Sequence, residues 1–332
     1  MNLNNSDFDI LDDYSKKSFS NLKLDYEKRE MTLVCGAGIS ISAGLPSWKN
    51  YLLKIIRIFL AHWRELEQNN KKYLDIAPKE MSIDLLEEYY DTHENTELEN
   101  DFANEDPLIL AQLIKNCIRP DDWKFLLKKA LYGEDKLGLH NSELINMICS
   151  FVVSSNNFKN IITYNYDDIL ESTFKNLGFL THSIIKENHH LKSKKFPIYH
   201  PHGILPFFGG IDGKIYLSEE DYLTDIIEPN SWYNQLHSTK LTSTCCLFIG
   251  LSFNDPSLKR KLAVHKLNPN HFHYAVMTHK NTEFEHKKFL LLRNELLRLN
   301  VRIIKYDYDE NHENLKKVIE LIYKYIVKKD IN

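Results

Sequence analysis

The sequence predicts an α/β protein with a Rossmann-like, doubly wound and mainly parallel sheet. Apolar runs typical of buried strands alternate along the chain with helical patterns. The strand signals lie at Asn160–Thr163, Phe196–Tyr199, Cys245–Leu251, His273–Met277 and Val301–Tyr306. The helical patterns lie at Asp168–Leu177, Pro256–Leu267, Glu283–Leu299 and Glu313–Val327. Strands that alternate with helices favour a parallel sheet with helices on both faces.

An earlier strand opens the fold. Met31–Cys35 is a short apolar run that ends at Gly36, and a helix-like stretch opens at Ser47-Trp48. A strand, a glycine turn and a helix in this order are the start of a nucleotide-binding α/β unit. Before them, residues 1–30 are polar with apolar residues at helical spacing. We therefore expect an N-terminal arm or helix there, which either docks or stays mobile.

A helical insertion is expected at approximately residues 51–150. Apolar residues recur there at helical spacing, and Asp121 is placed to cap a helix at Trp123–Leu131. The stretch Glu87–Asp106 is acidic, but it lacks the ligand spacing and the central glycine of a calcium loop. A solvated loop is therefore favoured over a cation site. Residues 31–330 are expected to form one large domain around the insertion.

Composition and charge exclude several classes of protein. The chain has 332 residues, 43% of them hydrophobic, and its 42 Lys and Arg against 46 Asp and Glu give a net charge of -4. This balance indicates a globular protein without a strongly basic surface, so no direct nucleic-acid binding is expected. No apolar run approaches the length of a membrane span, and no leader pattern opens the chain. The five cysteines are an odd number without CxxC spacing, which favours a reducing cytoplasm.

The turn after the first strand carries the first candidate binding site. Its sequence, CGAGISISAGLPSW, runs from Cys35 to Trp48. Glycines at Gly36 and Gly38 allow the backbone to approach a pyrophosphate, whose charge would be met by free N–H groups and the helix dipole. A bare GxG is often only a tight turn, but the run GAGIS followed by AGLP is more specific.

Two polar side chains follow later strands. Asn165 comes just after Asn160–Thr163, where open parallel sheets collect their ligand groups, but it is equally well placed to cap the helix that begins near Asp168. His202 follows Phe196–Tyr199, and an imidazole with a pKa near neutrality can accept a proton.

Two further positions leave alternatives open. His200 lies two residues before His202, so a His-x-His metal pair is an alternative, although no third ligand is obvious. The strand signal that ends at Leu251 runs into Ser252, which could bond a ribose or a phosphate. Asp255 is as well placed to cap the next helix as to contact a ligand.

Taken together, these segments resemble the sirtuin family. The run from Gly36 is similar to the opening motif GAGISxxAGIPDFR, with DFR replaced by Ser47-Trp48-Lys49. Thr163–Asp167 matches the family's TxNxD, His202-Gly203 matches its HG, and Gly250-Leu251-Ser252 is similar to its GxS. The altered DFR looks like the divergent bacterial branch of sirtuin-like NAD hydrolases rather than the protein deacylases.

The resemblance implies an NAD+ site with Asn165 and His202 as its catalytic residues. Asn165 would orient the nicotinamide ribose and the attacking water, and His202 would accept the proton of a ribose hydroxyl while positive charge develops at the anomeric carbon. Asp167 would support the loop or contact the nicotinamide amide. The residues expected to bind NAD+ are Gly36, Ala37, Gly38, Ser40, Ser42, Ala43, Trp48, Asp167, Gly250 and Ser252.

The activity implied by the resemblance is hydrolysis of NAD+ to nicotinamide and ADP-ribose. Protein-deacylating sirtuins carry a zinc module of two CxxC pairs after the HG motif, whereas residues 204–244 here contain no cysteine, so no metal is expected. NAD-dependent protein deacylation, ADP-ribosyl transfer and non-catalytic nucleotide sensing are the alternatives. Retention of Asn165 and His202 argues against the last of these.

The same branch implies a role in bacterial antiphage defence, in which the enzyme empties the NAD+ pool. Such an activity has to be restrained, and the sequence shows no obvious sensor domain. Control is therefore expected from homo-oligomerisation or from a separately encoded partner, which in this family can be a DNA-translocase-type ATPase, an Argonaute-like protein or a phage component. No membrane partner is expected.

Overall fold

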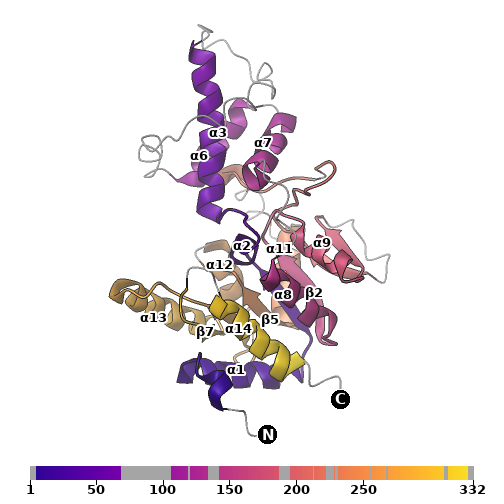
Figure 1. Cartoon of the computed structure of the whole chain (residues 1–332), viewed down its shortest axis with the longest axis vertical. Helices are drawn as coiled ribbons and strands as arrows, with labels where there is room; N and C mark the ends of the chain where they lie inside the picture. The colour runs from indigo at the N-terminus through magenta and orange to yellow at the C-terminus, as the bar shows by residue number, and fades with distance from the viewer. Residues whose placement is uncertain are drawn as a thin grey trace.

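The structure is a computed structural model of the chain (Figure 1). It describes residues 5–68, 106–118, 120–133, 142–186, 195–211, 213–221, 228, 231–253, 256–266, 268–309 and 313–327. Figure 1 shows a helical lobe at one end of the molecule and the sheet with its covering helices below it. Within these residues, no helix is long and apolar enough to cross a membrane.

Seven parallel strands form one sheet in the order β3-β4-β2-β1-β5-β6-β7. They are β1 (Met31–Cys35), β2 (Phe158–Thr163), β3 (Thr181–Ile184), β4 (Phe196–Tyr199), β5 (Cys245–Ile249), β6 (His273–Met277) and β7 (Val301–Lys305). From β1 the sheet grows in one direction through β2, β4 and β3, and in the other through β5, β6 and β7. This is a doubly wound, Rossmann-like sheet, so the predicted fold class is confirmed.

The described helices alternate with these strands. They are η1 (Asn5–Phe8), α1 (Asp13–Tyr26), α2 (Ala37–Ile41), α3 (Trp48–Gln68), α6 (Pro107–Cys117), α7 (Pro120–Tyr132), α8 (Glu143–Val153), α9 (Ile169–Asn176), α11 (Trp232–Ser243), α12 (Pro256–Val264), α13 (Glu283–Arg298), α14 (Glu313–Ile322) and the π-helical turn η3 (Tyr323–Val327). Several begin at a side-chain cap: Asp12 accepts from the Ser15 amide before α1, and Ser142 accepts from the Ile145 amide before α8.

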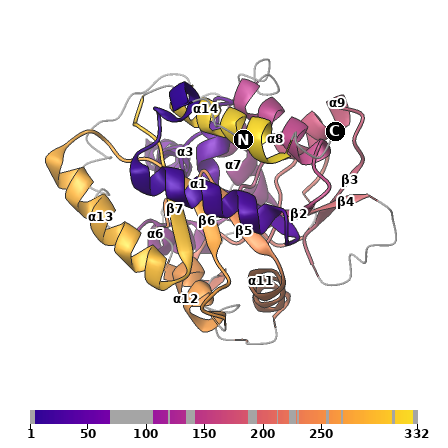
Figure 2. The same cartoon turned by 90° about the horizontal axis from the view of Figure 1, so that it is seen from below.

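Both faces of the sheet are apolar and covered by helices. Successive strand residues point to opposite faces, so Leu33 belongs to one core cluster and Val34 to the other. The Leu33 cluster includes residues of α1, α8 and α14, and the Val34 cluster includes residues of α11, α12 and α13. Figure 2 shows the two groups of helices on either side of the strands.

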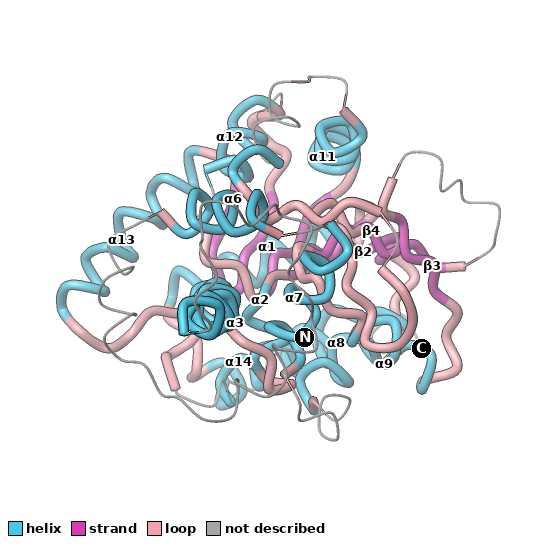
Figure 3. The backbone as a smooth tube through the Cα atoms, turned by 90° about the horizontal axis from the view of Figure 1, so that it is seen from above, coloured by secondary structure: helices cyan, strands magenta, loops and turns pink. Residues whose placement is uncertain are grey.

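Helices α3, α6 and α7 leave the sheet and pack on one another as the helical lobe. Tyr51 in α3 is buried, and its hydroxyl donates to the Leu127 carbonyl of α7 at 3.1 Å. Figure 3 views α3 nearly end-on above the rest of the chain. In contrast, α8 packs against α14 and α9 on the sheet. The helices that leave the sheet are therefore α3, α6 and α7.

Helix α1 crosses one face of the sheet (Figure 2). The Lys305 amide of β7 donates to the Ser15 hydroxyl at 2.8 Å, and the Tyr274 hydroxyl of β6 donates to Asp25 at 2.6 Å. Phe19 and Leu22 are almost fully buried between these contacts. In the structure, α1 is thus an integral part of the core on this face.

The structure corrects three local expectations. Helix α7 begins at Pro120, so Asp121 lies within the helix and is not its cap. The strand signal at Cys245–Leu251 runs past the end of β5, because the chain turns at Gly250, where φ is 73°. The edge strand β3 was not predicted at all. The acidic stretch Glu87–Asp106 lies outside the described residues except for Asp106 itself, which caps α6.

Candidate functional site

The candidate site lies at the carboxyl edge of the sheet, where three neighbouring strands end together. Cys35 of β1 is paired with Thr163 of β2 on one side and with Ile249 of β5 on the other. The loops after these strands therefore start side by side. The order of the strands reverses between β1 and β5, and open α/β sheets bind their ligands at such a point.

Asn165 and His202 lie in adjacent loops of this edge. Strands β2 and β4 pair through Ile162 and Tyr199, and each of the two candidate residues lies three positions beyond this pair. Both are nearly buried, with 7% of Asn165 and 6% of His202 exposed. The fold therefore brings together two residues that are 37 positions apart in the sequence (202 − 165).

The segment after β1 that carries Gly36 and Gly38, called the glycine loop below, packs directly against the loop after β5. The Gly36 amide donates to the Ile249 carbonyl at 3.0 Å, and the Gly38 amide donates to the Gly250 carbonyl at 2.9 Å. A Cβ on Gly36 would lie 2.6 Å from the Gly250 carbonyl oxygen, and a Cβ on Gly38 would lie 2.8 Å from the Gly250 Cα. These two amides are engaged within the protein, so the free N–H groups expected to meet a phosphate would have to come from other residues of this segment. The glycines instead permit the contact between the two loops.

Asn165 is held by the glycine loop. Its Nδ2 donates to the Gly36 carbonyl at 3.1 Å and to the Ser40 hydroxyl at 2.8 Å. The N-cap position of α9 is Asp168, and the Ile169 amide of its first turn is bonded by Asp167, so Asn165 does not cap this helix. The amide nitrogen of Asn165 is thereby fixed, which leaves its oxygen as the end that can accept from a ligand or a water.

Ser40 links Asn165 to Asp167. The Ser40 hydroxyl donates to Asp167 Oδ2 at 2.8 Å, while Oδ1 of the same carboxyl accepts from the Ile169 amide at 3.2 Å. Burial raises the pKa of Asp167 to about 6, against the opposing effect of these two hydrogen bonds. The geometry therefore gives Asp167 a supporting position in the loop, behind Asn165.

His202 lies within a cluster of aromatic rings. Its ring centre is 5.0 Å from that of Tyr164, 6.3 Å from that of Tyr166 and 6.0 Å from that of Tyr233. Burial lowers the pKa of His202 to about 3, and the positive charge of Lys261 adds to this lowering, while a backbone hydrogen bond with Tyr164 opposes it. The imidazole is therefore uncharged at neutral pH, and its pKa lies below the near-neutral value expected from the sequence. Gly203 follows with a φ of 87°, at a position where a side chain would meet the Lys214 carbonyl.

His200 and His202 have different partners. His200 is fully buried, and its Nε2 lies 2.7 Å from Glu171 Oε1, which also accepts from the Ser183 hydroxyl at 2.7 Å. Burial alone would lower the pKa of His200, but the charge and hydrogen bond of Glu171 outweigh it and leave this pKa raised. In the described part of the chain, no group of three or more His, Cys, Asp or Glu side chains is arranged to hold a metal ion.

The other residues expected to bind NAD+ lie around this edge in different settings. Trp48 is 38% exposed and stacks on Tyr166, with ring centres 6.2 Å apart. Ser252 is exposed just after the turn at Gly250. Ser42 bonds the Ser142 hydroxyl at the start of α8, and Ala43 is part of the core. Ala37 begins α2.

Three residues of the site were missed by sequence reasoning. Tyr233 and His237 come from α11, and Lys261 comes from α12. The Tyr164 hydroxyl lies 2.6 Å from His237 Nε2, and Lys261 Nζ lies 3.5 Å from the centre of the Tyr233 ring. Tyr164 stands in a quoted motif, but no local pattern in the sequence marks the three residues that the helices bring to it.

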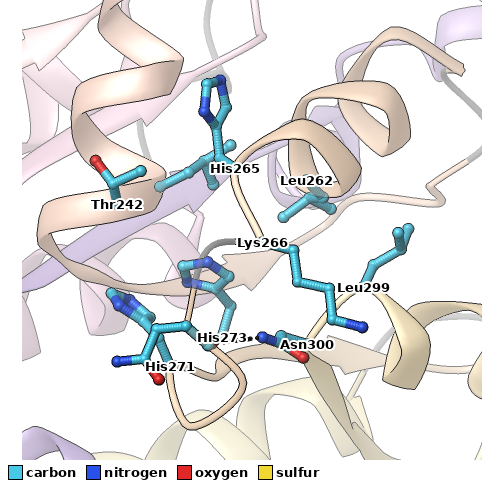
Figure 4. Close-up of a pocket in the computed structure, with 10 residues that line it drawn as sticks. Thr242, Leu262, His265, Lys266, His271, His273, Leu299 and Asn300 are labelled. Carbon is cyan, nitrogen blue, oxygen red and sulfur yellow. Dashed lines mark hydrogen bonds between the residues drawn. The ribbon is translucent and has the colours of Figure 1, made fainter.

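A cavity of about 120 Å³ lies elsewhere, on the opposite edge of the sheet (Figure 4). Its lining includes His273, the first residue of β6, and Asn300, the residue before β7. His273 Nδ1 accepts from the Cys246 amide at 3.1 Å, and Asn300 Nδ2 donates to the Asn268 carbonyl at 2.9 Å. These polar groups hold the amino ends of the strands together, away from Asn165.

Comparisons with known proteins give one family match, which covers part of the chain. A family model described as SIR2-like domain matches residues 159–303, a segment that contains Asn165 and His202 but begins after the glycine loop. Comparison with curated proteins gives no match. A solved structure from work on the structural basis for the mechanism and regulation of Sir2 enzymes is similar at 11% sequence identity and a TM-score of 0.42, over 97% of this chain and 99% of that chain. Residues 159–303, which are less than half of the chain, are thus similar to the SIR2-like domain family.

Proposed function

We propose that the chain is an NAD+ glycohydrolase that releases nicotinamide and ADP-ribose. The observation that carries the proposal is the pairing of two buried polar residues, Asn165 and His202, at equivalent positions beyond adjacent strands. A fixed amide and an uncharged imidazole are the groups needed to position a water and to accept a proton. The SIR2-like domain match over residues 159–303 supports NAD+ as the substrate.

In the proposed reaction, water replaces nicotinamide at the anomeric carbon of the ribose. The bond between this carbon and the pyridinium nitrogen breaks, and both of its electrons leave with nicotinamide, which becomes neutral. A water oriented by Asn165 bonds to the carbon and loses a proton, so that NAD+ and water give nicotinamide, ADP-ribose and a proton. His202 accepts a ribose hydroxyl proton while positive charge develops at the carbon and returns it to the ribose once the water has added, so that a single proton is released overall.

The biological role that fits this activity is depletion of NAD+ in bacterial antiphage defence. Support comes from the resemblance of the altered motif at Ser47-Trp48-Lys49 to the hydrolase branch and from the absence of cysteine between residues 204 and 244. We also propose that the chain acts as a homo-oligomer in the cytoplasm under the control of a separately encoded partner or a phage component.

The experiment that tests the proposed activity is a product analysis. The purified chain is incubated with NAD+, with and without an acetylated peptide, and the products are separated by liquid chromatography and mass spectrometry. Nicotinamide and ADP-ribose in equal amounts, independent of the peptide, are expected. O-acetyl-ADP-ribose formed only with the peptide would instead identify a deacylase, and NAD+ that binds but is never cleaved would identify a nucleotide sensor.

A further inference from the structure

A buried lysine lies against the ring stack that contains His202. Lys261 in α12 is only 8% exposed, and its Nζ lies 3.5 Å from the centre of the Tyr233 ring. Tyr233 in turn stacks on His202, with ring centres 6.0 Å apart and planes 21° apart. Three elements therefore contribute to this stack: α12 provides the lysine, α11 provides the phenol ring and the loop after β4 provides the imidazole.

A charge in this position is costly unless it interacts favourably with its surroundings. Burying an ammonium group removes its hydration, and the face of the Tyr233 ring replaces part of it through a cation–π contact. Lys261 also donates to the Ser257 hydroxyl at 3.0 Å, one turn earlier in α12. Packing alone would be served by an apolar side chain of similar length, so the lysine contributes a charge that the core does not require.

The surroundings of His202 make Lys261 the source of positive charge. Among the residues that the structure describes, titratable groups that face the His202 ring or interact with it include Tyr164 and Tyr166 from the loop after β2, Tyr233 and His237 from α11, and Lys261 from α12. Phenols carry no charge at neutral pH. Burial keeps the pKa of His237 well below its ordinary value, and Lys261 lowers it further, so this imidazole is also uncharged.

We propose that Lys261 is a positioning residue for His202, which keeps the imidazole in a single stacked orientation through Tyr233 and adds a positive charge beside this stack. The inference rests on the proposed function, since it assigns His202 the role of a base. A protonated His202 would face the like charge of Lys261 across a site of low dielectric constant, which disfavours that form. The imidazole of His202 therefore stays unprotonated even in mildly acidic solution, where an ordinary histidine is already protonated.

The test compares substitutions of two lysines in the same helix. Lys261→Met removes the charge and keeps the length, Lys261→Arg keeps the charge, and Lys259→Met is the matched control because Lys259 pairs with Glu295 away from the rings, at 2.9 Å. The rate of nicotinamide release is measured from pH 2.5 to 8, so that the range includes an acid limb set by the pKa of His202, which is about 3. The acid limb of this profile is expected to move up by about one pH unit in Lys261→Met, the size of a single partly buried charge interaction. It is expected to stay in place in the other two variants.

A second measurement does not depend on activity. Histidine ring signals are followed by NMR during a pH titration, and His202→Gln identifies the signal of His202. Its pKa is expected to rise in Lys261→Met and in a second variant, Lys261→Gln, which serves if the first does not fold. An unchanged His202 titration and acid limb in a folded charge-removing variant would overturn the inference. If the parent chain releases no nicotinamide, the proposed function fails, while the titration still decides the role of Lys261.

Discussion

At the scale of single residues, the orientation of the Asn165 amide group is set by the hydrogen bonds of its nitrogen. Its nitrogen is occupied by the Gly36 carbonyl and the Ser40 hydroxyl, at 3.1 Å and 2.8 Å. Because these bonds fix the nitrogen, they also fix the direction of the amide oxygen. Substitution to alanine would remove both the bonds and the oxygen. The side chain is therefore suited to hold a water or a ribose hydroxyl in one orientation, which is the role the proposed mechanism needs.

The first prediction concerns this amide. Asn165→Ala is expected to lower the rate of NAD+ cleavage by at least ~100-fold, the usual scale for a positioned catalytic group, with the fold intact. Asn176→Ala is the control, because Asn176 is exposed at the end of α9. Nicotinamide release and circular dichroism are measured for both variants. Parent-like turnover in Asn165→Ala would remove Asn165 from the mechanism.

The second prediction concerns the buried carboxyl of Asp167. Its pKa is about 6 in the folded chain, against an ordinary value of 3.8, so between these pH values the folded state holds a proton that the unfolded state has released. Asp167 therefore makes stability fall as pH rises through this window. Asp167→Asn is expected to unfold at higher urea concentration than the parent at pH 7, with a smaller difference near pH 4. A difference that is the same at both pH values would contradict this assignment.

Sequence reasoning identified the polar residues of the site but not their surroundings. Asn165 and His202 follow recognisable strands, so their convergence at one edge could be predicted from the order of the elements. Tyr233 and Lys261 lie on helices whose register against the sheet is set by packing of many apolar side chains. That register leaves no local signal in the sequence, which explains why the rings and the charge around His202 were missed.

At the scale of elements, the site depends on the contact between the glycine loop and the loop after β5. Gly38 lies so close to Gly250 that a Cβ would be 2.8 Å from the Gly250 Cα, whereas a Cβ on Gly210 would meet nothing within 4 Å. The glycine loop carries Gly36, whose carbonyl accepts from Asn165, and the loop after β5 carries Ser252. A shift of either loop would therefore change the site.

The third prediction tests this contact. Gly38→Ala is expected to lower the free energy of unfolding by about 1–3 kcal/mol, the usual cost of inserting a methyl group into a packed contact. Gly210→Ala is the matched control and should have little effect. Urea denaturation measures both. Stability of Gly38→Ala equal to that of Gly210→Ala would show that the loops can separate without cost.

The elements themselves were predictable to different degrees. The central strands β5 and β6 are buried at every residue and appear in the sequence as continuous apolar runs. The edge strand β3 has the sequence THSI, and only Ile184 is buried, so it lacks both an apolar run and a clear alternation. The start of α7 was misplaced because Asp121 has the type of a cap but follows Pro120, which itself opens the helix.

At the scale of the whole molecule, the packing of α1 in the core limits how regulation of the activity can be tested. Residues 1–30 were expected to form an arm or a helix, and deleting them would be a simple way to test whether they take part in regulation. Because Phe19, Leu22 and Tyr26 are buried, the deletion would also remove part of the core. Regulation is better tested on the full chain.

The fourth prediction therefore uses the intact protein. The isolated chain is expected to be an oligomer with low NAD+ hydrolysis, and activation is expected from a trigger that binds the active assembly more tightly than the inactive one. Mass photometry and an NAD+ assay at matched concentrations measure the two properties together. A monomer with full activity would contradict this proposal without bearing on the chemistry of the site.

Replacement of nicotinamide by water at a site built on Asn165 and His202 can be followed with isotope-labelled water. The parent chain and His202→Gln are incubated with NAD+ in water enriched in ¹⁸O, and nicotinamide and labelled ADP-ribose are quantified over time. Equal amounts of the two products are expected from the parent, and release is expected to be at least ~100-fold slower from His202→Gln. Equal rates from the two chains, or release of nicotinamide without labelled ADP-ribose, would contradict this mechanism.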